Sequence, residues 1–156
     1  MQNLTPSELD RFWAKVDKSA DCWTWTGSTS SHGYGDIQFR GNRQRAHRIS
    51  LSIATGERGP EFFADHICHN RACVNPEHLR WVTQKQNQEN RLATSKTNTS
   101  GFRGAAWYPR SGRWQSKVRH NGKDVHVGYF DTAEEAGEAA AAKRRELFTH
   151  NDADRI

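Results

Sequence analysis

The spacing of apolar and polar positions divides the first half of the chain into short helices and strands. Thr5, Pro6 and Glu8 have the order of a helix N-cap, a first helical position and a capping-box partner, and they predict a helix over residues 6–16. Alternating patterns predict strands at 22–25, 34–39 and 44–47, with Gly41 and Asn42 as the hairpin turn between the last two. Apolar positions on one side of residues 48–54 predict a short helix, which ends at the following glycines.

The pattern continues with a strand, a loop, a second strand and a helix, and then changes. Strands are predicted at 62–67 and 79–82, with residues 68–78 as the loop between them. Thr83 and Gln86 have capping-box spacing, so we expect a polar helix to begin there. The polar, aperiodic stretch 92–100 has the composition of a linker, and it predicts a first domain at 1–92, a linker at 93–98 and a second domain at 99–156.

The second domain has the pattern of strands followed by one helix. An alternating run predicts a strand at 114–119, Asn121 and Gly122 predict a hairpin turn, and residues 125–130 predict the returning strand. The alanine-rich run 133–147 is predicted as a helix from its propensity alone.

Composition predicts the type of binding partner and the cellular compartment. The 156 residues include 23 Lys and Arg against 18 Asp and Glu, and a basic chain favours a polyanion because phosphate contacts release counterions. Composition alone also fits a basic protein that is merely soluble. The chain shows neither a membrane-spanning apolar run nor a secretory signal pattern, which predicts a cytoplasmic protein without a membrane partner.

Three cysteines and one histidine carry the clearest chemistry. In a reducing cytosol, an odd number of closely spaced cysteines favours metal ligands over disulfides. Cys68, Cys73 and His78 lie in the predicted loop, and Cys22 would complete the four sulfur and nitrogen ligands of a structural zinc site. Zinc would then tie the early strand to the loop. The alternative is that the cysteines are small buried apolar side chains and the histidine is a polar loop residue.

Asp65 and His66 stand immediately before this loop and, with Asn87, supply groups suited to phosphodiester hydrolysis. The imidazole of His66 is available at pH 7 as a neutral general base. Asp65 and Asn87 offer one anionic and one neutral oxygen, a set that suits magnesium or manganese. Adjacent strand residues point to opposite faces, so we expect the strand to end or to bulge at this pair.

These motifs resemble the HNH endonucleases, whose site is a ββα-metal finger, over residues 10–92. The resemblance is carried by residues 65–68, 75–80 and 83–90, and the cysteines make the chain similar to the His-Cys box homing endonucleases and their phage relatives. It implies that His66 is the general base, that Asp65 and Asn87 bind the catalytic metal, and that His78 braces the loop besides binding zinc. It also implies a phage-encoded nuclease acting on double-stranded DNA, and it leaves open whether one strand is nicked or two chains together cut both.

The second domain resembles the DNA-binding domain of plant ethylene-response transcription factors over residues 99–151. The resemblance is carried by residues 101–104, 112–114, 128–130 and 132–136. In that family a three-stranded sheet reads the major groove, which implies DNA contacts from Arg103, Trp107, Arg113, Gln115, Lys117 and Arg119. His126 stands where the plant pattern has tryptophan, and the acidic residue usual near Lys117 is missing, so the plant target sequence does not carry over.

Two basic groups are therefore candidates for DNA binding. Strand alternation by itself places Arg113, Lys117 and Arg119 on one surface, with Gln115 between them. The alternative is a solvated basic sheet whose tryptophans pack on the helix. Arg40, Arg43 and Arg45 cluster around the first hairpin and form the second group.

The expected fold class is α+β: a small zinc-stapled ββα-metal nuclease module, followed by a three-stranded antiparallel sheet packed on one helix. The expected function is metal-dependent hydrolysis of duplex DNA. A non-catalytic, sequence-specific DNA-binding regulator is the alternative in which the finger is kept only as a scaffold. An RNA-binding protein, with aromatic side chains exposed for stacking, is a third interpretation.

Overall fold

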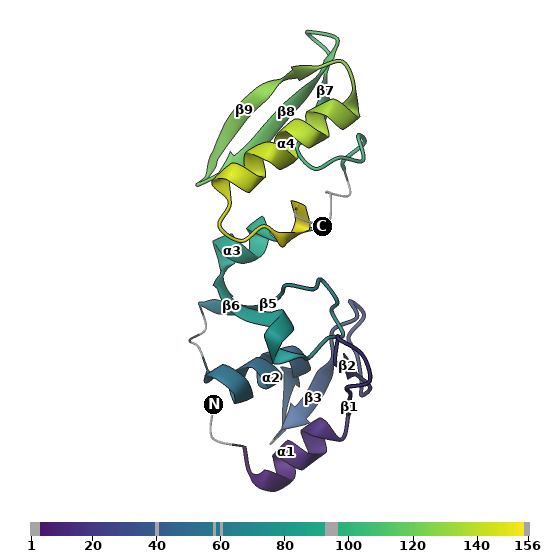
Figure 1. Cartoon of the computed structure of the whole chain (residues 1–156), viewed down its shortest axis with the longest axis vertical. Coiled ribbons are helices and arrows are strands. Elements are labelled where there is room, and N and C mark those ends of the chain that lie inside the picture. The colour runs from purple at the N-terminus through teal and green to yellow at the C-terminus, as the bar shows by residue number, and fades with distance from the viewer. Residues whose placement is uncertain (1–3, 40, 58, 60, 93–96, 155–156) are drawn as a thin grey trace. The chain divides into compact units, whose positions relative to one another are not determined.

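The computed structural model describes residues 4–39, 41–57, 59, 61–92 and 97–154, as a mixture of helices and small antiparallel sheets (Figure 1). The chain divides into two compact units, Met1–Lys85 and Gln86–Ile156. This division falls within helix α3 (Gln84–Glu89), earlier in the chain than the boundary expected after residue 92. In the part of the chain that the structure describes, no helix has the length and apolarity needed to cross a membrane.

The first unit contains three two-stranded antiparallel sheets and two complete helices. The sheets pair β1 with β2, β3 with β4, and β5 with β6. In chain order the elements are α1 (Pro6–Trp13), β1 (Val16–Asp17), β2 (Thr24–Trp25), β3 (Asp36–Phe39), β4 (Asn42–Arg45), α2 (Ala46–Thr55), β5 (Phe62–His66), the 3₁₀ turn η1 (Pro76–His78) and β6 (Leu79–Thr83).

Local signals place the start of α1 correctly, and tertiary pairing moves its end. The capping box between Thr5 and Glu8 is present, so the predicted start at Pro6 is confirmed. The helix ends at Trp13 rather than at residue 16, because Val16 pairs with Trp25 across the first small sheet. The strand pair supplies hydrogen-bond partners for backbone N–H and C=O groups at this point, and a longer helix would remove them.

The predicted turn of the first hairpin is wrong by one residue. Asn42 pairs with Phe39, so Asn42 is the first residue of β4 rather than part of the turn. Gly41 has a φ of 81°, which is the conformation that glycine adopts without steric cost. The strand also ends at Arg45, because α2 begins at Ala46.

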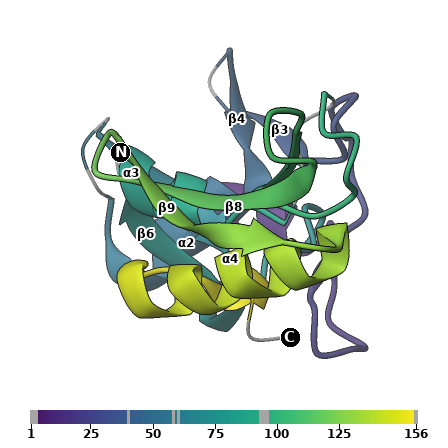
Figure 2. The same ribbon diagram turned by 90° about the horizontal axis from the view of Figure 1, so that it is seen from above.

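The second unit is a three-stranded antiparallel sheet with one helix on its face. The order is β7–β8–β9, and its elements are β7 (Ala105–Tyr108), β8 (Arg113–His120), β9 (Lys123–Phe130), α4 (Ala133–Leu147) and the 3₁₀ turn η2 (Asp152–Asp154). Helix α4 has the predicted bounds and lies along one face of the sheet (Figures 1 and 2). Asn121 and Gly122 both have positive φ and join β8 to β9, so the predicted hairpin turn is confirmed.

The two units have separate cores, built where apolar faces meet. In the first unit α1, β2, β3 and α2 contribute to one cluster: Phe12, Trp25, Ile37, Phe39, Ala46, Ile49 and Val74. In the second unit Val118, Ala140 and Phe148 pack between the sheet and α4. Each cluster is small, so buried hydrogen bonds and ion pairs also have a large part in fixing the structure of each unit.

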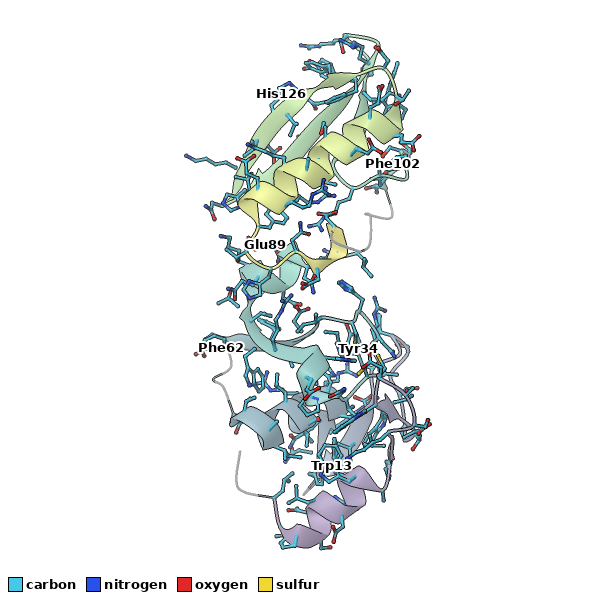
Figure 3. The ribbon with its side chains drawn as sticks, in the orientation of Figure 1. Trp13, Tyr34, Phe62, Glu89, Phe102 and His126 are labelled. Atoms are coloured by element: carbon cyan, nitrogen blue, oxygen red, sulfur yellow. The ribbon has the colours of Figure 1, made fainter. Side chains whose placement is uncertain are left out.

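The end of α3 belongs to the second unit through such contacts. The guanidinium of Arg103 donates to the carbonyls of Gln88, Glu89 and Arg91 at 3.2, 3.2 and 2.6 Å. Glu89, labelled in Figure 3, is buried, and its carboxylate accepts from the backbone amide of Thr149 at 3.1 Å. Residues 88–91 are thus fixed to this unit, while residues 93–96 of the predicted linker lie outside the described residues.

A buried ion pair closes the same unit. Arg144 of α4 donates through Nε and Nη2 to the carboxylate of Asp154 at 2.6 and 2.7 Å, and its Nη1 donates to the carbonyl of Arg103. Burial opposes ionisation of Asp154, but hydrogen bonds from Arg144 and Asn151, together with the charges of Arg144 and Arg103, outweigh it and lower the pKa of the carboxyl group. Two hydrogen bonds join the pair, and both side chains are only slightly exposed. Removing one partner therefore leaves the other as a buried, unpaired charge.

We predict that Asp154→Asn lowers the free energy of unfolding of the second unit by on the order of 3 kcal/mol at pH 7, because it leaves the buried guanidinium of Arg144 without its counterion. Since folding lowers the pKa of Asp154, this contribution is present above the unfolded pKa and is lost as the pH falls through the folded pKa. Hydrogen exchange of the α4 amides measures the change. Asp131→Asn is the control, because its pair with Arg113 is exposed, and an equal loss there would contradict the prediction.

Candidate active site and metal centre

The structure brings the three cysteines and His78 together. The ligand atoms of Cys22, Cys68, Cys73 and His78 all lie within 4.8 Å of one another. The Nδ1 atom of His78 lies 3.6 Å from the sulfur of Cys22 and 3.6 Å from that of Cys73. All three cysteines are free thiols, and the donor set and its closeness fit a tetrahedral zinc ion.

Backbone pairing between β2 and the loop builds this cluster. The amide of Trp25 donates to the carbonyl of Ala72 at 2.9 Å, and the amide of Val74 donates to the carbonyl of Trp23 at 2.8 Å. Thr24 therefore lies opposite Cys73, which is fully buried. Cys22 follows into the cluster because it stands two residues before Thr24.

The contact between two of the sulfurs favours ionisation of one of them, which is the form that metals bind. A hydrogen bond from Cys73 lowers the pKa of Cys68 to about 5, while the same contact and burial raise the pKa of Cys73. A carboxylate oxygen of Asp21 lies 3.4 Å from Nε2 of His78. This contact orients the ring so that Nδ1 faces the sulfurs, as outer partners of ligand histidines commonly do.

His66 is the last residue of β5, and its ring is held by the loop that carries Cys68, Cys73 and His78. Its Nε2 lies 3.0 Å from the carbonyl oxygen of Cys73. A carbonyl only accepts, so Nε2 carries the proton and the neutral ring keeps its lone pair on Nδ1. Burial lowers the pKa of His66, which favours the neutral imidazole that a general base requires.

Two further rings surround His66, and the sequence analysis missed both. His47, in the first turn of α2, has its ring centroid 4.6 Å from that of His66. Burial, followed by the charges of its neighbours, lowers the pKa of His47 to about 3. The ring centroid of Tyr34, labelled in Figure 3, lies 5.4 Å from that of His47 and 5.9 Å from that of His66. No spacing rule marks these positions, because they meet only after β3, β4 and α2 have packed.

Asp65 faces a different partner from its neighbour. It pairs across the hairpin with Arg80, whose Nε and Nη2 donate to its Oδ2 at 3.1 and 3.0 Å. The pairing of β5 with β6 (Leu79–Thr83) is regular, and β5 ends at His66, in line with the expected end of the strand. Arg80 orients the carboxylate, which is the support that a carboxylate ligand of a metal commonly has.

The other residues predicted for the cutting site and the first hairpin lie on different elements. Asn87 lies on α3 within the second unit, and its part in a metal site stays a prediction. Arg43 and Arg45 both pair with Asp36, and both side chains keep considerable exposure. Arg40 lies outside the described residues.

The sheet of the second unit has one basic face. Arg113, Gln115, Lys117 and Arg119 alternate along β8, while Ser116 and Val118 are buried toward α4. The basic face also carries a carboxylate, because Asp124 lies 3.2 Å from Lys117 and 3.4 Å from Arg119. His126, labelled in Figure 3, pairs with Lys117, and its ring lies 4.8 Å from that of Tyr129.

Two members of the predicted DNA-contacting set are placed elsewhere. Trp107 pairs directly with Trp114, with ring centroids 5.4 Å apart, so it lies on the opposite face from Arg113. Arg103 precedes the sheet, and its guanidinium is bonded to the carbonyls at the end of α3. Burial lowers the pKa of Arg103, which is consistent with a structural position rather than an open basic surface.

One comparison with known proteins covers the β5–loop–β6 hairpin and the helix that follows it. Residues 44–89 match the model of the HNH endonuclease family. The HNH match contains Asp65, His66 and Asn87, together with three of the four clustered metal ligands, and Cys22 lies before it.

Similar proteins come from phages and from plants. Protein 2.8 of Escherichia phage T7 is 35% identical over 71 residues, which are 44% of this chain and 48% of the phage protein. Protein 3.8 of the same phage is 29% identical over 93 residues, 58% of this chain and 76% of that protein. The AP2-like ethylene-responsive transcription factor TOE2 of Arabidopsis thaliana is 44% identical over 55 residues, 33% of this chain and 11% of the plant protein. No solved structure matches the chain.

The chain spans about half of Protein 2.8 and about a tenth of the plant factor. The comparisons therefore give a match to the HNH endonuclease model at residues 44–89 and a partial likeness to AP2-like factors. The names of the two phage proteins state no activity, so the reaction of this chain rests on its own residues.

We predict that the purified protein contains about one zinc per chain, because four ligand atoms converge on one point. Cys73→Ser should remove the zinc and also loosen the ring of His66, whose partner carbonyl belongs to that residue. Elemental analysis measures the first effect, and histidine NMR signals measure the second. Less than half a zinc per chain, in folded and unchelated wild-type protein, would count against the site.

Proposed function

We propose that the chain is a metal-dependent endonuclease that hydrolyses phosphodiester bonds of double-stranded DNA. The observation that carries this proposal is the hydrogen bond from Nε2 of His66 to the carbonyl of Cys73, within the segment that matches the HNH endonucleases. It fixes a buried, neutral imidazole with Nδ1 as the basic atom. A general base of this kind contributes roughly a hundredfold to ten-thousandfold to the rate of hydrolysis.

In this proposal His66 takes a proton from the water that attacks phosphorus. Asp65 and Asn87 would hold magnesium or manganese, whose chemistry at that position is to stabilise negative charge on the phosphate and the leaving oxygen. Arg80 keeps the carboxylate of Asp65 in place through two hydrogen bonds. The products would be 5′-phosphate and 3′-hydroxyl ends.

The zinc cluster of Cys22, Cys68, Cys73 and His78 has a structural part in the proposal, as in the His-Cys box nucleases that the chain resembles. Its four ligands leave no open position for a substrate, and its task is to hold the loop whose carbonyl orients His66. The sheet of the second unit would place the nuclease on DNA through Arg113, Gln115, Lys117 and Arg119. The likeness to a plant transcription factor supports nucleic acid as the partner of this unit.

We predict that His66→Ala lowers DNA cleavage by at least about a hundredfold, because the variant lacks the general base. A plasmid-nicking assay with magnesium or manganese measures the effect, and strand-resolved mapping of the ends shows whether one or both strands are cut. DNA binding and zinc content serve as controls and should stay at wild-type values. Near-full cleavage by the folded variant would overturn the assignment of His66.

The same assay separates this proposal from a non-catalytic DNA-binding regulator. A regulator would bind duplex DNA without cutting it under any metal condition. Asp65, His66 and the supporting contacts from Arg80 and Cys73 are all in place, which is the observation that favours catalysis over a scaffold role.

We predict that the double variant Lys117→Ala/Arg119→Ala weakens DNA binding. It should also reduce the slope of log affinity against log salt by the amount that about two lost phosphate contacts would give. Fluorescence anisotropy over a range of salt concentrations measures both. Lys143→Ala is the control, because Lys143 lies on α4 and pairs with Glu146, away from the basic face. Equal losses in the control would argue for a non-specific effect of net charge.

A further inference from the structure

Tyr34 links the candidate base to two arginines that the catalytic proposal does not use. The guanidinium carbon of Arg45 lies 5.6 Å from the centroid of the tyrosine ring, and that of Arg71 lies 5.5 Å from it. The rings of His47 and His66 approach the same tyrosine at 5.4 and 5.9 Å. One aromatic side chain, Tyr34, therefore contacts two cations and also approaches the imidazole of His66.

The charges around Tyr34 do not cancel. Asp36 is the carboxylate on this side, and it is shared by Arg43 and Arg45. Among the described residues, no ion pair includes Arg71, whose Nη1 donates to the backbone carbonyl of His32 at 3.1 Å. Asp36 thus offsets the charges of Arg43 and Arg45 only in part, and it does not pair with Arg71. An excess of positive charge beside a general base attracts an anionic substrate and stabilises charge on it.

Arg71 is placed by the same loop that places the base. It lies between Cys68 and Cys73, and the next residue, Ala72, is paired through its carbonyl with Trp25 of β2. Cys73 follows and holds His66 through its own carbonyl. Arg71 and His66 are therefore positioned by neighbouring backbone groups of one fixed loop, with the His32 carbonyl as a second anchor for Arg71.

A polar cavity borders Arg45 and the residue that anchors Arg71. The cavity has a volume of about 470 Å³ and is lined by residues 29–32, Asp36 and residues 43–45. Its walls carry hydroxyl, imidazole, amide and guanidinium groups and the carboxylate of Asp36. His32 belongs both to this wall and to the anchor of Arg71.

We propose that Arg71, together with Arg45 and supported by the ring of Tyr34, forms a phosphate-binding site that holds the DNA backbone beside His66. This proposal rests on the proposed nuclease function and names the side chains that hold the scissile strand. A guanidinium suits the task because its planar fork can donate two parallel hydrogen bonds to phosphate oxygens and keeps its charge at any working pH. Arg71 is then a residue that touches the substrate, and Tyr34 is a positioning residue.

The salt dependence of binding tests this site without any cleavage. The probe is a short random-sequence duplex in the presence of EDTA, with the zinc content of each variant checked by elemental analysis. Arg71→Ala should reduce the slope of log affinity against log salt by about 0.9, the value for one lost phosphate contact. Arg71→Lys retains the charge and should keep most of the slope. Lys15→Ala removes the same charge from a position outside the cluster and should leave the slope at the wild-type value.

Single-turnover cleavage at saturating DNA gives a second readout. Arg71→Ala should slow the reaction by roughly tenfold or more if the guanidinium contacts the phosphate during hydrolysis, and Arg71→Lys should recover part of that loss. A wild-type slope in the zinc-loaded Arg71→Ala protein would overturn the phosphate site. Absence of cleavage by the wild-type protein would instead overturn the nuclease function, since the slope comparison does not depend on catalysis.

Discussion

The hydrogen bond between Nε2 of His66 and the carbonyl of Cys73 connects the two kinds of chemistry in this chain. One end is the candidate base, and the other is the backbone of a residue in the Cys22, Cys68, Cys73 and His78 cluster. A backbone carbonyl can orient a ring only if the backbone itself is held. The pairing of the loop with β2 and the burial of Val74 hold it, and a metal ion on the four clustered ligands would fix it further.

Carboxylates in this protein are placed next to the cations that are candidates for DNA contact. Asp36 stands by the arginines of the first hairpin, while Asp124 and Asp131 stand by those of the sheet. The pairs of Asp124 and Asp131 are exposed and contribute little to stability, because solvent screens them and their side chains lose freedom in forming them. Asp36 itself is buried, although its arginine partners keep considerable exposure. Arg71 differs in that a carbonyl and an aromatic ring hold it without offsetting its charge.

Helix α3 joins the two units as a continuous element of the chain. Its first residues belong to the first unit, and its end is bonded by Arg103, Glu89 and the residues after α4 to the second unit. The second unit is therefore more than a sheet with one helix, because it includes the segment that directly follows the β5–β6 hairpin in the chain. Asn87, the proposed metal ligand, lies one residue before the part of α3 whose carbonyls Arg103 binds.

The sequence by itself determined the features that depend on near neighbours along the chain. The capping box at Thr5 marks the start of α1, the alanine-rich run 133–147 marks α4, the Asn121-Gly122 pair marks its hairpin turn, and alternation places the basic residues of β8 on one face. The metal-ligand set was also visible, because sulfur and imidazole donors in a loop are a chemical signal. Only the tertiary structure decided which groups meet from distant segments. It places Tyr34 and His47 around His66. It also bonds Arg103 to carbonyls at the end of α3 and places Trp107 on the sheet face opposite the basic one. These contacts join residues whose separation along the chain carries no period, so they follow from packing and backbone pairing rather than from any local pattern.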